Sequence, residues 1–196
     1  MRTFLLAAIL ILQPVVACAS VTDEVKQVVD KVIAVVTDKE MKKPQNEGKR
    51  RAALDRAISP IFDYAEMAKL SLAVHWRGRT PAEQKEFVGL FKTLLDNSYA
   101  GKIESYNNEK IVYLKENVEG DNAEVNSKII TPRREEYSVD YRLMKEGGKW
   151  MVYDVVIEGV SLVSNYRSQF NRIVRSQGYE ALVKKLKEKS AEIKAP

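Results

Sequence analysis

The sequence predicts an α+β fold in which helices precede and follow an antiparallel β-sheet. Apolar residues recur with the helical period of about 3.6 up to residue 107 and after residue 161, and with the strand period of about 2 in between. Short links that contain glycine or proline separate the expected strands, which indicates hairpins and therefore a four-stranded meander. Helices segregated from an antiparallel sheet in this way pack on one of its faces.

The start of the chain has the composition of a secretory signal peptide. An apolar run from Phe4 to Leu12 follows a basic residue, and Ala17-Cys18-Ala19 satisfies the small-x-small rule for cleavage. We therefore expect residues 1–19 to be a signal peptide. Residues 20–196 are expected to form a single domain that is exported to the periplasm.

Cysteine content and charge limit the classes of protein to be considered. Cys18 is the only cysteine, so cleavage leaves a mature protein without disulfides that depends on its core for stability. Val15-Val16-Ala17-Cys18 also resembles a weak lipobox, and a lipidated Cys18 is the alternative. The formal net charge is +5, with 27 acidic residues scattered among the basic ones. This distribution argues against nucleic-acid binding and leaves a weak attraction to anionic membranes open.

Two amphipathic helices are expected before residue 60. Valines and one isoleucine recur at helical spacing within residues 21–41, and packing must form this helix because valine has a poor helix propensity. A second helix is expected over residues 50–58. Leu54 and Ile58 would face inward, and Arg50 would lie in solvent with the other two arginines of this helix.

Two further helices are marked by their caps. Asp63 can cap a helix that carries Met67, Leu70 and Val74 on its inner face. Thr80-Pro81-Ala82-Glu83 is a capping box with proline at the first helical position. The helix that it starts continues towards Tyr106. Its apolar stripe consists of Phe87, Leu90, Phe91, Leu94 and Leu95.

The meander and the C-terminal helices follow. Strands are expected at roughly 110–118, 122–131, 135–145 and 149–158. The fourth strand is apolar on both faces except at Asp154, which indicates a central place in the sheet. Ser161 offers an N-cap for a helix that Gly178 ends. A last, basic helix is expected from Tyr179 to about Ile193.

The sequence carries no catalytic or cofactor signature. It contains neither a G-x-S-x-G elbow nor a P-loop nor a Rossmann fingerprint. His75 is the only histidine, and a lone histidine beside Trp76 and Arg77 at a helix end is more often structural than catalytic. Without cysteine, a metal site would have only dispersed carboxylates as further ligands. We therefore expect no enzyme activity, no metal and no cofactor.

Asp154 has two interpretations. The one that we favour is a structural carboxylate bonded to backbone N–H groups or to an arginine such as Arg142 or Arg167. The other is a carboxyl with a raised pKa in an apolar pocket, where a proton-transfer enzyme would use it together with Tyr153 or Tyr141.

Two series of residues resemble a known family. The first is Asp63-Tyr64-x-x-Met67, Trp76-Arg77, Thr80-Pro81-x-x-Gln84, Phe87-x-x-Leu90-Phe91-x-x-Leu94-Leu95 and Tyr99. The second is Gly148-x-Trp150-x-Val152-Tyr153-Asp154-Val155, Ile157-Glu158-Gly159-Val160-Ser161-Leu162-Val163 and Asn165-Tyr166-Arg167-x-Gln169-Phe170. These runs are similar to the signatures of the MlaC (toluene-tolerance, ABC-transport auxiliary) family. Two positions depart from the pattern: Ala73 stands where the family often has glycine, and Arg79 where it often has leucine.

The resemblance implies an NTF2-like cone of α+β type and a soluble, monomeric periplasmic carrier of phospholipid. Such a carrier would bind acyl chains in an apolar pocket, since each buried CH₂ group is worth about 0.8 kcal/mol. It would shuttle lipid between an inner-membrane MlaFEDB-type ABC transporter complex and an outer-membrane MlaA-type lipoprotein complex. The alternatives are a hopanoid-linked carrier of the same family and a cone-fold proton-transfer enzyme that uses Asp154.

The expected lipid-binding residues are apolar side chains that would face the inside of the cone. Those on helices are Met67, Leu70, Val74, Phe87, Phe91, Leu94, Tyr166, Phe170 and Val174. Those on strands are Tyr113, Val125, Ile129, Tyr141 and Val152.

Overall fold

The computed structural model describes residues 19–192. The cleavage site and the alternative lipidation at Cys18 therefore lie outside the described residues. The α-helices are α1 (Val21–Thr37), α2 (Glu47–Ile58), α3 (Tyr64–Leu72), α4 (Pro81–Glu104), α5 (Leu162–Gln177) and α6 (Tyr179–Glu192), and the short 3-10 helices are η1 (Pro44–Asn46) and η2 (Ala73–His75). The strands are β1 (Lys110–Glu119), β2 (Asn122–Ile130), β3 (Glu136–Glu146), β4 (Lys149–Ile157) and β5 (Val160–Ser161).

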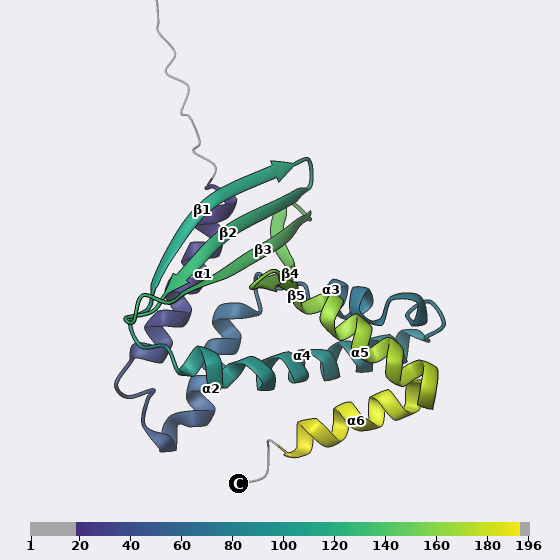
Figure 1. The fold of residues 1–196 in the computed structure, drawn as a ribbon. Coiled ribbons are helices and arrows are strands. Elements are labelled where there is room, and N and C mark those ends of the chain that lie inside the picture. Colours follow the sequence, from purple (N-terminus) through teal and green to yellow (C-terminus); the bar gives the residue numbers. More distant parts are fainter. Residues whose placement is uncertain (1–18, 193–196) are drawn as a thin grey trace, which may run out of the picture.

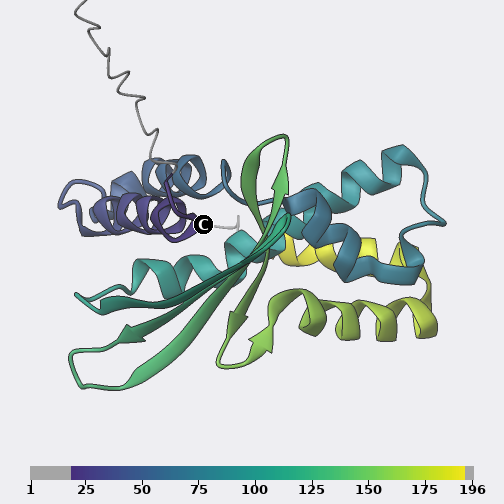
Figure 2. The same ribbon diagram turned by 90° about the horizontal axis from the view of Figure 1, so that it is seen from above.

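The described strands form one antiparallel sheet in the order β1-β2-β3-β4-β5. The α+β class and the four-stranded meander are confirmed, and the two-residue β5 extends the meander by one short strand. Figure 1 shows α4 running beneath the sheet. Seen from above, α1 and α2 gather at one end of the molecule and α3, α5 and α6 at the other (Figure 2). The helices thus form two groups that α4 connects.

Strand β4 is central because both of its edges carry hydrogen bonds. β3 pairs along one edge, and β5 pairs with the end of the opposite edge. On that opposite edge, the N–H of Val152 donates to the carbonyl of Ile61 at 2.7 Å, and its carbonyl accepts from the N–H of Asp63 at 2.9 Å. The β3–β4 register shifts between Arg142 and Leu143, opposite this exchange. The segment that leads into α3 is thereby fixed to the sheet.

The predicted helix caps are present. The Thr80 hydroxyl accepts from the N–H of Glu83 at 3.3 Å, and the Glu83 carboxylate accepts from the N–H of Thr80 at 2.7 Å, which completes the capping box of α4. The Ser161 hydroxyl caps α5 by accepting from the N–H of Ser164 at 3.0 Å. Arg79 lies 4.5 Å over the ring of Tyr179. This contact joins the start of α4 to the start of α6.

Two expectations about side-chain orientation are wrong. Val74 does not share the inner face of α3, because the helix ends at Leu72 and Ala73 adopts a φ of 49°, which turns the chain before the next helical position. Val74 is consequently 77% exposed. Arg50 is not solvated: its side chain is 13% exposed and lies 3.1 Å from the Glu104 carboxylate.

The positive φ of Ala73 generates a stability prediction. Non-glycine residues carry strain in this region of φ, so Ala73→Gly should raise the free energy of unfolding by about 1 kcal/mol. Ala65→Gly, at an exposed position within α3, should lower the free energy of unfolding by about 0.5–1 kcal/mol. Urea unfolding of the two variants measures both effects. A destabilised Ala73→Gly variant would contradict the assigned backbone conformation.

Candidate functional site

The interior contains two clusters of buried apolar side chains. The helical cluster lies among α3, α4, α5 and α6 and comprises Met67, Ala68, Leu72, Phe87, Phe91, Leu94, Leu95, Val163, Tyr166, Phe170, Tyr179, Leu182, Val183 and Leu186. The sheet cluster covers one face of the sheet and comprises Val21, Val25, Ile61, Ala123, Val125, Val139, Leu143, Val152, Val155 and Leu162. Phe62 and Tyr99 are partly buried against both clusters. These two aromatic rings therefore form the boundary between the clusters.

The helical cluster is organised by aromatic rings in close contact. Phe91 lies 5.5 Å from Tyr166 and 5.9 Å from Phe170, centroid to centroid, in edge-to-face geometry. Phe87 meets Phe170 at 5.6 Å in the same way. Phe87 and Phe91 have no exposed surface. Such pairs stabilise a core beyond their burial alone, and this packing is that of a closed helical core.

The sheet cluster is an apolar surface set by the strand register. Val125 stands opposite Tyr141, and Tyr141 stands opposite Val155. Residues paired in this way project to the same side of a sheet, as do residues two positions apart. The surface that these side chains define is called here the inner face. α1 packs on it through Val21 and Val25, which are 3% and 2% exposed.

Three apolar positions of the inner face are only partly closed. Tyr113, Ile129 and Tyr141 pack against the sheet cluster without being fully buried. Burial raises the pKa of Tyr141 to about 12 and also raises the pKa of Tyr113. Within the described residues, the Tyr113 hydroxyl has no hydrogen-bond partner although it is shielded from solvent. The inner face therefore combines an apolar surface with a polar atom that still has bonding capacity.

Carboxylates attach two helices to the sheet. The Asp154 carboxylate accepts from the N–H of Val163 at 3.1 Å and from the Ser161 hydroxyl at 2.6 Å, both at the start of α5, and lies 3.4 Å from Arg142. The Glu116 carboxylate accepts from the N–H of Thr22 at 2.7 Å, in the first turn of α1. Negative charge at these positions complements the unpaired N–H groups of a helix N-terminus.

The geometry of Asp154 supports its structural interpretation. Its carboxylate is occupied by two donors and an arginine, as described above, and Asp154 is 3% exposed. Asp154 stands opposite Arg142 in the register, whereas Tyr141 stands opposite Val155. Adjacent residues of a strand project to opposite sides, so Asp154 and Tyr141 do not meet on one face. Arg167, the other arginine considered for Asp154, donates instead to the carbonyl of Leu70 at 2.9 Å.

The fourteen expected lipid-binding residues fall into three groups. Eight belong to the helical cluster or pack against it: Met67, Leu70, Phe87, Phe91, Leu94, Tyr166, Phe170 and Val174. Five lie on the inner face: Tyr113, Val125, Ile129, Tyr141 and Val152. Val74 lies at the surface, apart from both. The structure therefore brings the five strand residues together on one surface and separates them from most of the helical ones.

Sequence reasoning missed three residues that shape this interior. Phe62 and Tyr99 bridge the two clusters, and Glu116 ties the inner face to α1. Tyr99 continues the apolar stripe of its helix, which is a signal that could have identified it. The roles of Phe62 and Glu116 depend on contacts between segments far apart in the chain, which periodicity does not reveal.

The described residues offer few other sites of chemical interest. Across residues 19–192, His, Cys, Asp and Glu side chains form no group of three or more that could hold a metal ion. None of the helices in this range is both long and apolar enough to span a membrane. The Nε2 atom of His75 lies 2.9 Å from the Asn171 side-chain oxygen and so links η2 to α5.

Comparisons with known proteins agree on one family. Residues 26–188 match the family described as MlaC protein. The binding protein MlaC of the intermembrane phospholipid transport system of Haemophilus influenzae is 23% identical over 97% of this chain and 91% of its own length. The toluene tolerance protein ttg2D of Pseudomonas putida is 29% identical over 64% of this chain and 60% of its own. A solved structure of the phospholipid-binding protein from Ralstonia solanacearum, in complex with a phospholipid, has a TM-score of 0.81 and 28% identity, covering 90% of this chain and 100% of that one.

The contacts of Asp154 predict a loss of stability on substitution. Asp154→Asn removes the charge that attracts Arg142 and the first turn of α5, and we expect the free energy of unfolding to fall by about 1–3 kcal/mol. The control Asp121→Asn changes an exposed residue between β1 and β2 and should stay within about 0.5 kcal/mol of the wild type. Urea unfolding at neutral pH provides the measurement. Equal stability of the two variants would mean that Asp154 does not fasten α5.

Proposed function

The chain belongs to the MlaC protein family, and on that premise we propose that it is a carrier that binds phospholipid by its acyl chains and moves it between membranes. The observation that carries this proposal is the apolar cluster on the inner face of the sheet. An acyl chain in water gains about 0.8 kcal/mol for each CH₂ group that it buries. A surface of this kind is therefore sufficient to hold a lipid without any catalytic group.

The known relatives support the class of ligand. The Haemophilus relative is a binding protein of an intermembrane phospholipid transport system, and the Ralstonia structure is of a phospholipid-binding protein in complex with a phospholipid. Its fold matches most of this chain. We propose the same ligand class here, with phospholipid as cargo and no cofactor.

Within the molecule, we propose that the acyl chains lie against the inner face rather than within the helical cluster. The rings of Phe87, Phe91 and Phe170 already fill their surroundings with close edge-to-face contacts, and opening such a core costs several kcal/mol. Tyr113 and Tyr141, by contrast, are partly buried on the inner face. The unpaired Tyr113 hydroxyl could then donate to an ester or phosphate oxygen of the lipid.

Helix α1 is the element that would move to make room for the bound lipid. Val28 and Val29 of this helix are partly buried against the sheet cluster, whereas Val21 and Val25 nearer its start are fully buried. The bond from the N–H of Thr22 to Glu116 fixes the same end. Val36, towards the C-terminal end of α1, is only 2% exposed, so both ends of the helix are packed, and it is the partly buried middle around Val28 and Val29 that would make room for an acyl chain.

The proposed carrier acts without catalysis, as a monomer in the periplasm. The sequence of residues 1–19, typical of a signal peptide, supports export. We propose partners of the MlaFEDB type at the inner membrane and of the MlaA type at the outer membrane. The Haemophilus relative belongs to an intermembrane phospholipid transport system, which supports a partner at each membrane. The fastening of Asp154 to α5 argues against its use in proton transfer.

The ligand is tested by extraction from protein purified without added lipid. We expect phospholipid in roughly one-to-one proportion to protein after denaturation, detected by mass spectrometry, because a buried acyl chain dissociates only slowly into water. Hopanoid in the extract would instead identify the alternative cargo. A folded protein that arrives empty and takes up no lipid from vesicles would refute the carrier.

The position of the ligand is tested by a pair of neighbouring isoleucines. Ile129 lies on the inner face and Ile130 on the opposite one, and both are partly buried. Ile129→Trp should occupy space needed by an acyl chain and reduce the lipid recovered by severalfold, whereas Ile130→Trp should leave it unchanged. Thermal unfolding checks that both variants are folded. An equal effect of the two substitutions would argue against the inner face as the binding surface.

A further inference from the structure

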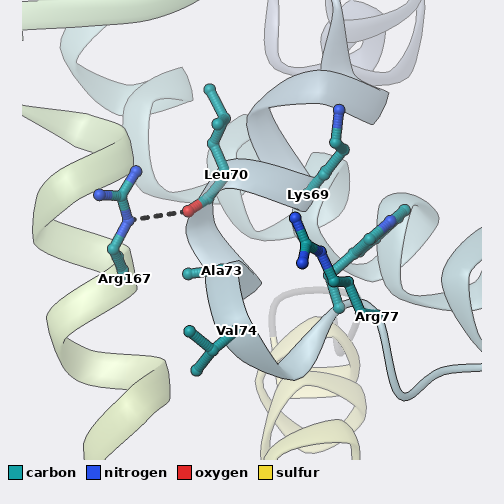
Figure 3. Close-up of a pocket in the computed structure, with 7 residues that line it drawn as sticks. Lys69, Leu70, Ala73, Val74, Arg77 and Arg167 are labelled. Carbon is teal, nitrogen blue, oxygen red and sulfur yellow. Dashed lines mark hydrogen bonds between the residues drawn. The ribbon is translucent and has the colours of Figure 1, made fainter.

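A separate groove lies on the surface where α3 ends, beside α5 (Figure 3). It has a volume of about 550 Å³ and is lined by the end of α3, by η2 and by α5. Figure 3 shows Leu70, Ala73 and Val74 at its centre, with Arg167 on one side and Lys69 and Arg77 on the other. None of these positions faces the proposed lipid site on the sheet.

The groove is cationic. Lys69, Arg77 and Arg167 line it, and no acidic residue does so. Lys69 is paired with Glu66 at 2.8 Å. Among the described residues, neither Arg77 nor Arg167 has an acidic partner within ion-pair distance. Arg167 uses its Nε–H to bind the carbonyl of Leu70, which leaves its terminal nitrogens available.

The same groove presents apolar side chains to solvent. Val74 is 77% exposed, more than any other exposed large apolar side chain of the described residues. Trp76 and Leu70, beside it in the groove, are partly buried. Indole rings and short apolar side chains that alternate with basic groups are typical of surfaces that rest at the boundary between lipid headgroups and acyl chains.

The exposure of Val74 is maintained by the contacts of the surrounding turn. His75 bonds to Asn171 of α5, as described above, and the amide of Gln84 in α4 donates to the carbonyl of Trp76 at 3.3 Å. Arg167 holds the carbonyl of Leu70. The turn is thus fastened on both sides of Val74 to two different helices, so that the side chain is held outward by the fold.

We propose that this groove docks on an anionic membrane surface. The guanidinium groups of Arg77 and Arg167 bind phosphate oxygens of the lipid headgroups, while Val74 and Trp76 enter the boundary below them. Charge complementarity selects this occupant, because the two guanidinium groups that have no acidic partner among the described residues, those of Arg77 and Arg167, attract a negatively charged surface. Docking here does not depend on the cargo, and it brings the carrier close to the membrane independently of the inner face.

Flotation with lipid vesicles tests the proposal. Wild-type protein should float with vesicles of equal parts phosphatidylcholine and phosphatidylglycerol, and much less with vesicles of phosphatidylcholine alone. Arg77→Gln should lower binding to the anionic vesicles roughly fivefold, because one basic contact is lost. Arg77→Lys should retain most of the binding, since it keeps the charge. Val74→Ser should weaken binding through the apolar contact, without any change in charge.

The matched control is Arg133→Gln, which removes the charge of another exposed arginine, in the link between β2 and β3. It should leave vesicle binding unchanged, and the amount of copurified lipid should be the same in all variants. Equal binding of the wild type to neutral and anionic vesicles would overturn the proposal. So would an equal loss for Arg133→Gln, which would indicate a general charge effect. Absence of vesicle binding by the wild type would also overturn it and would favour an acidic protein surface as the occupant.

Discussion

The buried carboxylate of Asp154 holds the first turn of α5 against β4, and the arrangement of both apolar clusters depends on that contact. β4 carries β3 on one edge and the segment before α3 on the other. α3 and α5 therefore both start from the same strand, and α4 and α6 pack on them. A carboxylate that is 3% exposed keeps this position only because backbone, hydroxyl and guanidinium donors surround it. The apolar part of the strand, residues 150–157, thus contains one charge, and that charge holds α5 in place.

The two halves of the interior, the helical cluster and the inner face, differ in how closely they are packed. The helical cluster is closed by aromatic rings in mutual contact and gives the molecule a rigid half. The inner face retains partly buried tyrosines and is covered by α1, a valine-rich helix with a weak intrinsic preference for its own conformation. We propose that lipid binds at the inner face, because contacts between α1 and the sheet can be replaced there by contacts with an acyl chain. The basic groove lies on the surface of the other, helical half.

Much of the fold could be predicted from local patterns. The capping residues Thr80, Glu83 and Ser161 predict where α4 and α5 begin, because a cap depends on residues close in sequence. The strands are predicted by alternating apolar residues and by the short links between them. Val74 could not be placed in this way, since a single positive φ at Ala73 interrupts the helical register. Periodicity also predicts that the side chains of Phe87 and Tyr141 both face the interior, and it does not distinguish the two. Only the tertiary packing distinguishes the fully buried ring of Phe87 from the partly buried ring of Tyr141 on the inner face.

The most direct test of the inner face as a lipid site is photo-crosslinking with a phospholipid that carries a diazirine in its acyl chain. The label should appear on peptides of strands β1 to β4, above all around Tyr113, Ile129 and Tyr141, and on α1. The helical residues Phe87, Phe91 and Phe170 should remain unlabelled. Label confined to α4 and α5, with none on the strands, would place the lipid within the helical cluster and contradict the proposed site.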